Sequence, residues 1–219
     1  MVYIPYQYDK HMFENKLVKR GLYTKLISSI NEYKDRGSIV TLIGPALETH
    51  YNELRPILRP RSDLLMAEYD SDLIKRECIV ERIKNLHDDR ITFFKGDVWD
   101  SIKKRYKNCG WHHKHVLFDM DFCCTAKTAF DNGLTRHLEW LITSKLPRRK
   151  GFWISLTFCR RKDTKEIWRS LPSDVLYLYG KYGWSMTEER VITYTEKSPN
   201  KKGRVGANMV MMWFRFRNY

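Results

Sequence analysis

Short apolar runs alternate with helix-forming segments along most of the chain, and this alternation constrains the fold more than any other feature. The apolar, strand-like runs lie at residues 38–44, 63–69, 90–97, 115–122 and 151–158. Apolar side chains at helical spacing mark the segments between them, at residues 48–58, 71–86, 126–144 and 164–182. Strands separated by helices pair in parallel, so the pattern predicts an α/β doubly wound sheet.

The end of the chain breaks this rhythm. Residues 189–197 and 208–216 are both strand-like, and only a polar turn separates them. Two strands without an intervening helix form an antiparallel hairpin. The expected fold is therefore a mostly parallel, seven-stranded sheet with a C-terminal antiparallel hairpin. A helical pattern also precedes the first strand, so we expect an N-terminal arm and helix (1–36) packed on a single domain (37–219).

Charge is the strongest compositional signal. The 219 residues include 40 Lys and Arg against 26 Asp and Glu, which gives a net charge of +14 at pH 7. A domain with such an excess usually binds a polyanion, and nucleic acid is the commonest one. Two basic loops follow strands, and we expect their cations to bind phosphates: Arg160, Arg161, Lys162, Lys197, Lys201, Lys202 and Arg204. A solvated basic face without a partner is the alternative.

Cysteine usage and the lack of long apolar runs indicate an intracellular, cytoplasmic protein that is not bound to a membrane. The five cysteines are odd in number and lack CxxC spacing, so we expect reduced thiols. No stretch reaches the roughly 18 apolar residues of a membrane helix, and the first ten residues lack the features of a secretory signal. The Cys and His residues of 109–115 lack paired ligand spacing, so no metal is expected.

Acidic residues stand where several of the strand-like runs end. The run 63–69 stops at Glu68, with Asp70 close behind, and the run 90–97 stops at Asp97. The run 115–122 ends in FDMDF. Together with the order of elements and the terminal hairpin, these residues resemble class I S-adenosylmethionine (SAM) dependent methyltransferases. The resemblance covers the chain from about residue 35 to its end and depends on no single diagnostic motif.

The resemblance implies SAM as the cofactor, bound at the carboxyl ends of the strands. Glu68 matches the acid that accepts hydrogen bonds from both ribose hydroxyls, a role that suits a pure acceptor. Asp97 matches the acid that binds the adenine amino group. The implied cofactor set is completed by Gly44, Pro45, Val98, Asp119 and Phe122. Each strand-end acid could instead cap the following helix, and we prefer that interpretation for Asp70.

The FDMDF segment also looks like the Asp-Met pair of viral RNA 2′-O-methyltransferases, whose site combines two lysines, an aspartate and a glutamate. This likeness implies a catalytic Asp119, with Asp121 and Lys162 as further candidates. The fifth-strand lysine of that set falls near Leu156 or Thr157, with Arg160, Arg161 and Lys162 just beyond. The glutamate falls near Asn208, with Glu196 as a displaced candidate, and the first lysine could be Lys16, Lys19 or Lys25. The expected function is SAM-dependent methylation of nucleic acid, with RNA favoured over DNA and the ribose 2′-oxygen as target. A viral origin would place the protein in the host cytoplasm.

Two departures from the family keep a second hypothesis open. The first loop reads LIGPALETH, with one glycine where the family has several, and Pro45 removes a backbone donor. The four-residue catalytic set is also incomplete. The alternative is a catalytically inactive methyltransferase fold that serves as a nucleic-acid-binding or scaffolding subunit beside a protein partner.

Overall fold

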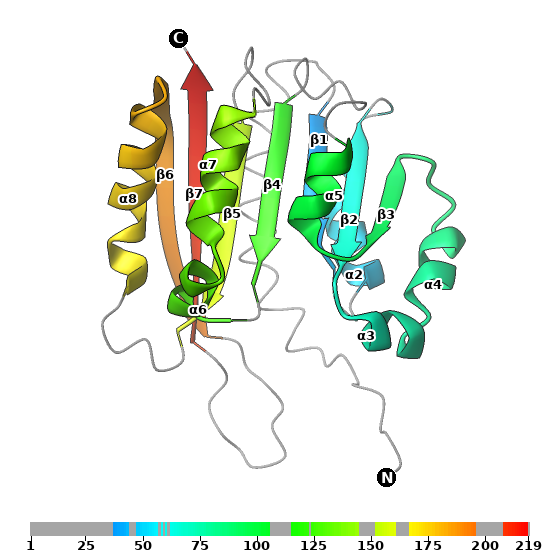
Figure 1. Cartoon of the computed structure of the whole chain (residues 1–219). Coiled ribbons are helices and arrows are strands. Elements are labelled where there is room, and N and C mark those ends of the chain that lie inside the picture. Colours follow the sequence, from blue (N-terminus) through cyan, green and yellow to red (C-terminus); the bar gives the residue numbers. More distant parts are fainter. Residues whose placement is uncertain are drawn as a thin grey trace, which may run out of the picture.

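A computed structural model of the chain describes residues 37–43, 47–56, 58, 60, 62–105, 115–122, 124–144, 152–160, 167–195 and 208–218. In these residues, seven strands form one mixed sheet in the order β3-β2-β1-β4-β5-β7-β6 (Figure 1). Five strands run parallel to one another: β1 (Gly37–Leu42), β2 (Asp63–Glu68), β3 (Ile91–Lys95), β4 (His115–Asp121) and β5 (Phe152–Cys159). The predicted doubly wound, mostly parallel sheet is confirmed.

The C-terminal hairpin is confirmed as well. β6 (Trp184–Thr195) and β7 (Asn208–Asn218) pair with each other in antiparallel fashion, and β7 also pairs antiparallel with β5. The last strand is therefore inserted between β5 and β6. β6 begins at Trp184, five residues earlier than the apolar pattern predicted, and a register shift between Met186 and Glu188 interrupts its pairing. This irregularity lies in the part of the strand that the prediction left out.

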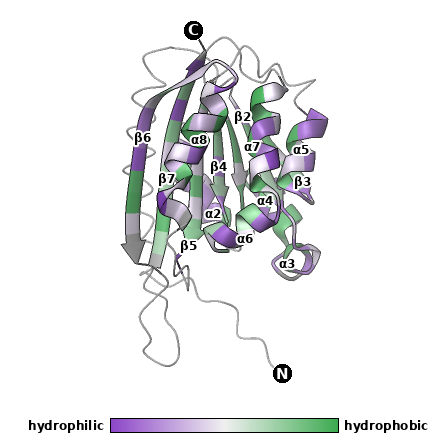
Figure 2. Ribbon diagram, turned by 60° about the vertical axis from the view of Figure 1, so that its left-hand side comes forward, coloured by the Kyte–Doolittle hydropathy of each residue, from purple (hydrophilic) through white to green (hydrophobic). Residues whose placement is uncertain are grey.

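Helices cover both faces of the sheet. One face carries α5 (Val98–Arg105), α6 (Ala126–Asp131), α7 (Leu134–Thr143) and α8 (Leu171–Gly180), whose apolar residues share one core cluster with the strands. The other face carries α2 (Leu47–Leu54), α3 (Ser71–Arg76) and α4 (Ile79–Asn85), which contribute to a second cluster. We call these the α5 face and the α2 face. Figure 2 shows both hydrophobic and hydrophilic residues on these helices, as expected for helices with one buried side.

Two helices predicted as continuous are each broken in two. The prediction of one helix at 71–86 was wrong, because Cys78 adopts a left-handed conformation (φ 48°) between α3 and α4. Ile74 and Ile79 belong to the same buried cluster. Five residues in a continuous helix would place them about 140° apart, so the break lets both side chains face the sheet. Gly133 (φ 88°) breaks the segment 126–144 between α6 and α7 in the same way.

Three further elements differ from the prediction. The segment 164–182 is described as a short 3-10 turn, η2 (Ile167–Arg169), followed by α8. α2 ends at Leu54, four residues before the predicted end at 58. α5, which follows Asp97, was not predicted at all, since its apolar residues are few among lysines and an arginine. The predicted N-terminal arm and helix (1–36) lie outside the described residues, and so that division remains a prediction.

Parallel pairing brings the carboxyl ends of β1 to β5 to one edge of the sheet, which lies at the bottom of Figure 1. We call it the carboxyl edge. In open α/β sheets, ligands bind outside this edge. None of the described helices is long and apolar enough to cross a membrane.

Candidate functional site

Glu68 ends β2 at the carboxyl edge, as the sequence predicted. Its side-chain Oε1 accepts the backbone N–H of Asp70 at 2.9 Å, which fixes the carboxylate beside its own strand end. Partial burial raises the pKa of the Glu68 carboxyl above its ordinary value, although backbone N–H groups of Asp70 and Tyr69 oppose the rise. The backbone carbonyl of Glu68 accepts the N–H of Gly96 at 2.9 Å, so the ends of β2 and β3 are tied together.

Two acids that follow Glu68 in the sequence, Asp70 and Asp97, cap helices. Asp70 Oδ1 accepts the backbone N–H groups of Asp72 at 2.9 Å and Leu73 at 3.0 Å, which confirms the preferred interpretation of Asp70 as the N-cap of α3. Asp97 behaves in the same manner, because its Oδ1 accepts the N–H groups of Trp99 at 2.8 Å and Asp100 at 3.0 Å. Asp97 therefore caps α5 with one oxygen, and any ligand role would fall to the other.

Gly96 shapes the turn that presents Asp97. Its φ of +132° lies in a region that side-chain-bearing residues rarely adopt. Val98, the next cofactor candidate, turns its side chain into the core cluster of the α5 face and is only 5% exposed. Only the backbone of Val98 could therefore face a ligand.

Asp119 is fully buried in a polar network on the α2 face. Its Oδ2 accepts the hydroxyl of Thr41 on β1 at 3.1 Å and lies 3.9 Å from Nε2 of His50 on α2. The same Thr41 hydroxyl is 2.8 Å from His50 Nε2. The network joins β1, α2 and β4 just inside the carboxyl edge. Thr41 and His50 were not predicted as part of the site, because only the pairing of β1 with β4 and the packing of α2 bring them to Asp119.

Asp121 and Phe122 lie at the end of β4 and are partly exposed. The side chain of Asp121 lies on the same side of β4 as that of Asp119, because side chains two residues apart in a strand share a face. Phe122 stacks on Phe158 with ring centres 5.5 Å apart, and its N–H binds the carbonyl of Thr157 at 2.9 Å. Of the two aspartates, Asp121 is the one with access to solvent at the edge, whereas Asp119 is fully buried.

The second lysine and the glutamate of the implied catalytic set have no equivalents at the matched positions. Leu156 is fully buried on the α5 face, and Thr157 is fully buried and paired in register with Asp121. Asn208 is the first residue of β7, which places it at the carboxyl edge because β7 runs antiparallel to β5. Among the described residues, no three His, Cys, Asp or Glu side chains gather to hold a metal ion.

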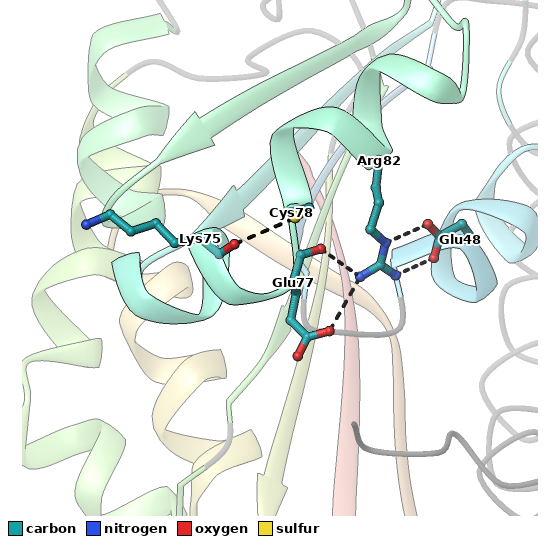
Figure 3. Close-up of polar contacts among 5 residues, drawn as sticks. All are labelled: Glu48, Lys75, Glu77, Cys78 and Arg82. Carbon is teal, nitrogen blue, oxygen red and sulfur yellow. Dashed lines mark hydrogen bonds and ion pairs between the residues drawn. The ribbon is translucent and has the colours of Figure 1, made fainter. Parts of the chain in front are cut away.

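A bidentate ion pair links the helices that follow the first two strands (Figure 3). Arg82 of α4 donates from Nε to Glu48 Oε1 at 2.7 Å and from Nη2 to Glu48 Oε2, and Glu48 lies in the first turn of α2. Arg82 also contacts the carboxylate of Glu77 at 3.8 Å. Arg82 lowers the pKa of the Glu48 carboxyl through these hydrogen bonds. The bridge fixes α2, which follows the first loop, against α4.

Arg160 follows β5 at the carboxyl edge, partly exposed, with its Cζ 5.1 Å from the centre of the Trp168 ring. The other basic residues and the first-loop candidates lie outside the described residues: Gly44, Pro45, Arg161, Lys162, Lys197, Lys201, Lys202 and Arg204. Their assignment to the site remains a prediction. The described part of the site thus consists of acids at the ends of β2, β3 and β4 and one arginine after β5.

Comparison with known proteins identifies the fold. The sequence matches no protein-family model and no curated protein. By structure, it is similar to M. jannaschii TYW2 in complex with AdoMet, at 12% identity and a TM-score of 0.51, over 98% of this chain and 80% of that one. It is also similar to a 16S rRNA (adenine(1408)-N(1))-methyltransferase from Catenulisporales acidiphilia with cosubstrate SAM, at 9% identity and a TM-score of 0.51, over 91% and 92%.

A third similar structure is that of an antibiotic related methyltransferase, at 9% identity and a TM-score of 0.50, over 90% of this chain and 92% of that one. The chain therefore has the fold of class I SAM-dependent methyltransferases, as the resemblance implied. The three proteins differ in what they are named for, so the shared fold does not by itself identify a substrate. The likeness to viral enzymes remains a prediction.

Proposed function

We propose that the protein transfers a methyl group from SAM to nucleic acid, with RNA as the favoured substrate. The observation that carries the proposal is the partly buried carboxylate of Glu68, held at the end of β2 in a sheet of the methyltransferase type. At this position a carboxylate, which accepts hydrogen bonds and donates none, fits the two hydroxyls of a ribose. The residues at the ends of β2 and β3 are therefore chemically suited to SAM.

The proposed roles follow the positions of the side chains. Glu68 would hold the ribose of the cofactor, and Asp97 would bind its adenine amino group. When bound, SAM supplies a methyl group on a sulfonium, which is already a strong electrophile, so alignment of the nucleophile provides most of the rate. Asp121, at the exposed end of β4, accepts a hydrogen bond from the nucleophile and orients it. Asp119 is a positioning residue, because its contacts with Thr41 and His50 hold the end of β4 against β1 and α2.

Charge supports nucleic acid as the substrate class. The net charge of +14 and the position of Arg160 at the carboxyl edge favour a polyanion that is held through its phosphates. One of the similar structures is named as a 16S rRNA methyltransferase with cosubstrate SAM, and another is in complex with AdoMet. This likeness agrees with the proposal without defining the target. Within RNA, we propose the ribose 2′-hydroxyl as the acceptor. A hydroxyl must lose its proton on methylation, and a carboxylate at the site would assist that loss.

Calorimetric titration with SAM tests the cofactor part of the proposal. We expect the wild-type protein to bind, and Glu68→Gln to bind at least about tenfold more weakly, because it loses charge-assisted hydrogen bonds of about 1.5 kcal/mol or more. Glu81→Gln, an exposed change on α4, is the matched control and should bind like wild type. If the folded wild-type protein binds no SAM at millimolar concentration, the proposal fails and the inactive, scaffolding alternative stands.

Transfer from labelled SAM tests the substrate part. Single-stranded RNA, the same sequence as DNA, and RNA with 2′-deoxy nucleotides should be offered in parallel. Labelling of the RNA alone supports ribose methylation, whereas equal labelling of RNA and DNA shows that the acceptor is on the base. Labelling of neither, by a protein that binds SAM, rejects nucleic acid as the substrate.

A further inference from the structure

One half of the α2 face is buried, although none of the described helices lies over it. On β5 and β7, the side chains of Trp153, Met211 and Trp213 are 4%, 1% and 4% exposed and belong to the core cluster of the α2 face. We call these three residues the β5–β7 patch. α2, α3 and α4 lie beside β1, β2 and β3 (Figure 1), and none of them packs extensively on β5, β6 or β7. Another part of the chain therefore covers the patch.

Two buried hydroxyl groups lie beside the patch. Ser155 and Thr157 share the face of β5 on which Trp153 lies, because side chains two residues apart in a strand point the same way. Both residues are fully buried, and neither hydroxyl has a hydrogen-bond partner among the described residues. Buried polar groups in proteins are almost always hydrogen-bonded. The covering part of the chain should therefore offer polar groups as well as apolar ones.

Connectivity leaves one segment that can reach the patch. Of the undescribed segments longer than three residues, 106–114 and 145–151 join helices of the α5 face to the starts of β4 and β5, and 161–166 joins β5 to η2. Residues 196–207 connect β6 to β7 at the carboxyl edge. Residues 1–36 are the longest of these segments and lead directly into β1, which neighbours β4. Since connections between neighbouring elements are short, only 1–36 has the length and the attachment point to cross this face.

The sequence of this segment fits such a surface. Apolar side chains at helical spacing give residues 22–33 one apolar side, which consists of Leu22, Leu26, Ile30 and Tyr33. The opposite side is polar and includes Lys25, Ser28, Glu32 and Asp35. A helix over residues 22–35 would be about 21 Å long, close to the roughly 26 Å of an eight-residue strand such as β5. Both the length and the polarity of the segment match the surface.

We propose that residues 22–35 form a helix that docks on the α2 face over β4, β5 and β7, with Leu22, Leu26 and Ile30 against the β5–β7 patch. A helix that ends beside the start of β1 runs antiparallel to β1, so its first turn lies near the carboxyl edge. The chain before Leu22 is thereby directed towards the candidate site. The inference concerns packing alone, so it does not depend on the proposed function.

Photo-crosslinking in the full-length protein tests the contact. With p-benzoylphenylalanine in place of Leu26, we expect irradiation to link this position to peptides from β5 and β7. The same amino acid in place of Ser28, on the polar side of the predicted helix, is the matched control and should give few links to either strand. Links from position 26 to helices of the α5 face, or equal links from both positions, would overturn the inference. Links between two chains would overturn it as well, because a second copy would then occupy the patch.

Hydroxyl-radical footprinting with mass spectrometry gives an independent measurement. Leu26→Asp combined with Ile30→Asp places two charges on the apolar side of the predicted helix, and we expect oxidation of the β5–β7 patch to rise several-fold. Ser28→Asp adds a charge on the polar side and should leave the patch as protected as in wild type. Unchanged protection in the doubly substituted protein, or equal oxidation in Ser28→Asp, contradicts the proposed docking.

Two buried residues away from the patch report whether the fold survives the substitutions. Met66 of β2 lies in the part of the α2 face that α2, α3 and α4 cover, and Trp99 lies on the α5 face. Both should stay protected when the docked helix alone is displaced. If they are oxidised together with the patch, the substitutions have unfolded the protein, and the crosslinks from position 26 decide the question because they require no charge in the interface.

Discussion

Asp88 anchors the start of β3 at the edge opposite the candidate site, and replacing it should destabilise the fold without affecting ligands. Its carboxylate accepts hydrogen bonds from the hydroxyl of Tyr51 on α2 at 2.6 Å and from Nε and Nη2 of Arg90 at 2.8 and 2.6 Å. Arg90 also donates from Nη1 to the carbonyl of Leu58 at 2.8 Å. The side chain of Asp88 is 8% exposed, and that of Arg90 is 23% exposed.

The expected loss follows from these contacts. Asp88→Asn keeps one acceptor oxygen but loses the charge and about two charge-assisted hydrogen bonds, each with a contribution of about 1.5 kcal/mol. Because Arg90 is partly solvated, water would replace some of this interaction. We therefore expect the free energy of unfolding to fall by about 2 kcal/mol. For a chain of this length, that corresponds to a decrease in Tm of roughly 4 to 8 °C.

The pH dependence gives a second measurement. Hydrogen bonds from Arg90 hold the pKa of the Asp88 carboxyl well below its usual range. Since the pKa is lowered in the folded state, the ionised group stabilises the protein fully above the unfolded value of about 4, and this contribution is lost as the pH falls further. The difference between wild type and Asp88→Asn should thus be largest near pH 7 and should shrink below about pH 4.

Urea unfolding at several pH values measures both effects. Asp89→Asn is the matched control, because Asp89 is exposed and adjacent in the sequence, and it should change stability by less than about 0.5 kcal/mol. If Asp88→Asn and Asp89→Asn lose the same small amount, or if the difference from wild type persists unchanged at pH 3, the carboxylate does not hold this edge as the contacts indicate.

Two further changes test the packing around the sheet. Glu48→Gln should lower the free energy of unfolding by about 0.5 to 1 kcal/mol, because the ion pair with Arg82 is bidentate but half exposed; a loss no greater than that of Glu81→Gln in urea unfolding would show that the pair contributes nothing. Tyr179→Phe should raise the free energy of unfolding by about 1 kcal/mol, since the fully buried Tyr179 hydroxyl has no partner among the described residues. A lower Tm for Tyr179→Phe would refute that account.

The existence and type of most elements follow from local pattern. Short apolar runs predicted each of the first five strands, and the hairpin followed from two runs without a helix between them. The acids at the strand ends could also be predicted, since a polar residue that ends an apolar run marks the edge of a parallel sheet. α5 was missed because a short helix among lysines has too few apolar residues to show a period.

Helix breaks were decided by tertiary packing. Ile74 and Ile79 look compatible with one helix when only apolar spacing is counted, yet both must reach the same buried cluster. The left-handed conformation at Cys78 makes this possible, and no residue type at that position signals it, since Cys has no preference for positive φ. Gly133 does offer such a signal, and a glycine inside a helical pattern could have been interpreted as a boundary.

The sequence by itself determined the alternation, the terminal hairpin and the acids Glu68 and Asp97 at the strand ends, because period and polarity are local properties of the chain. Only the tertiary structure decided which acids are accessible. Asp119 and Asp121 look equivalent in FDMDF, but pairing with β1 buries Asp119 against Thr41 and His50 and leaves Asp121 at the edge. The strand period gives the side of the sheet on which a residue lies, whereas burial depends on elements that are distant in the sequence and pack over that side.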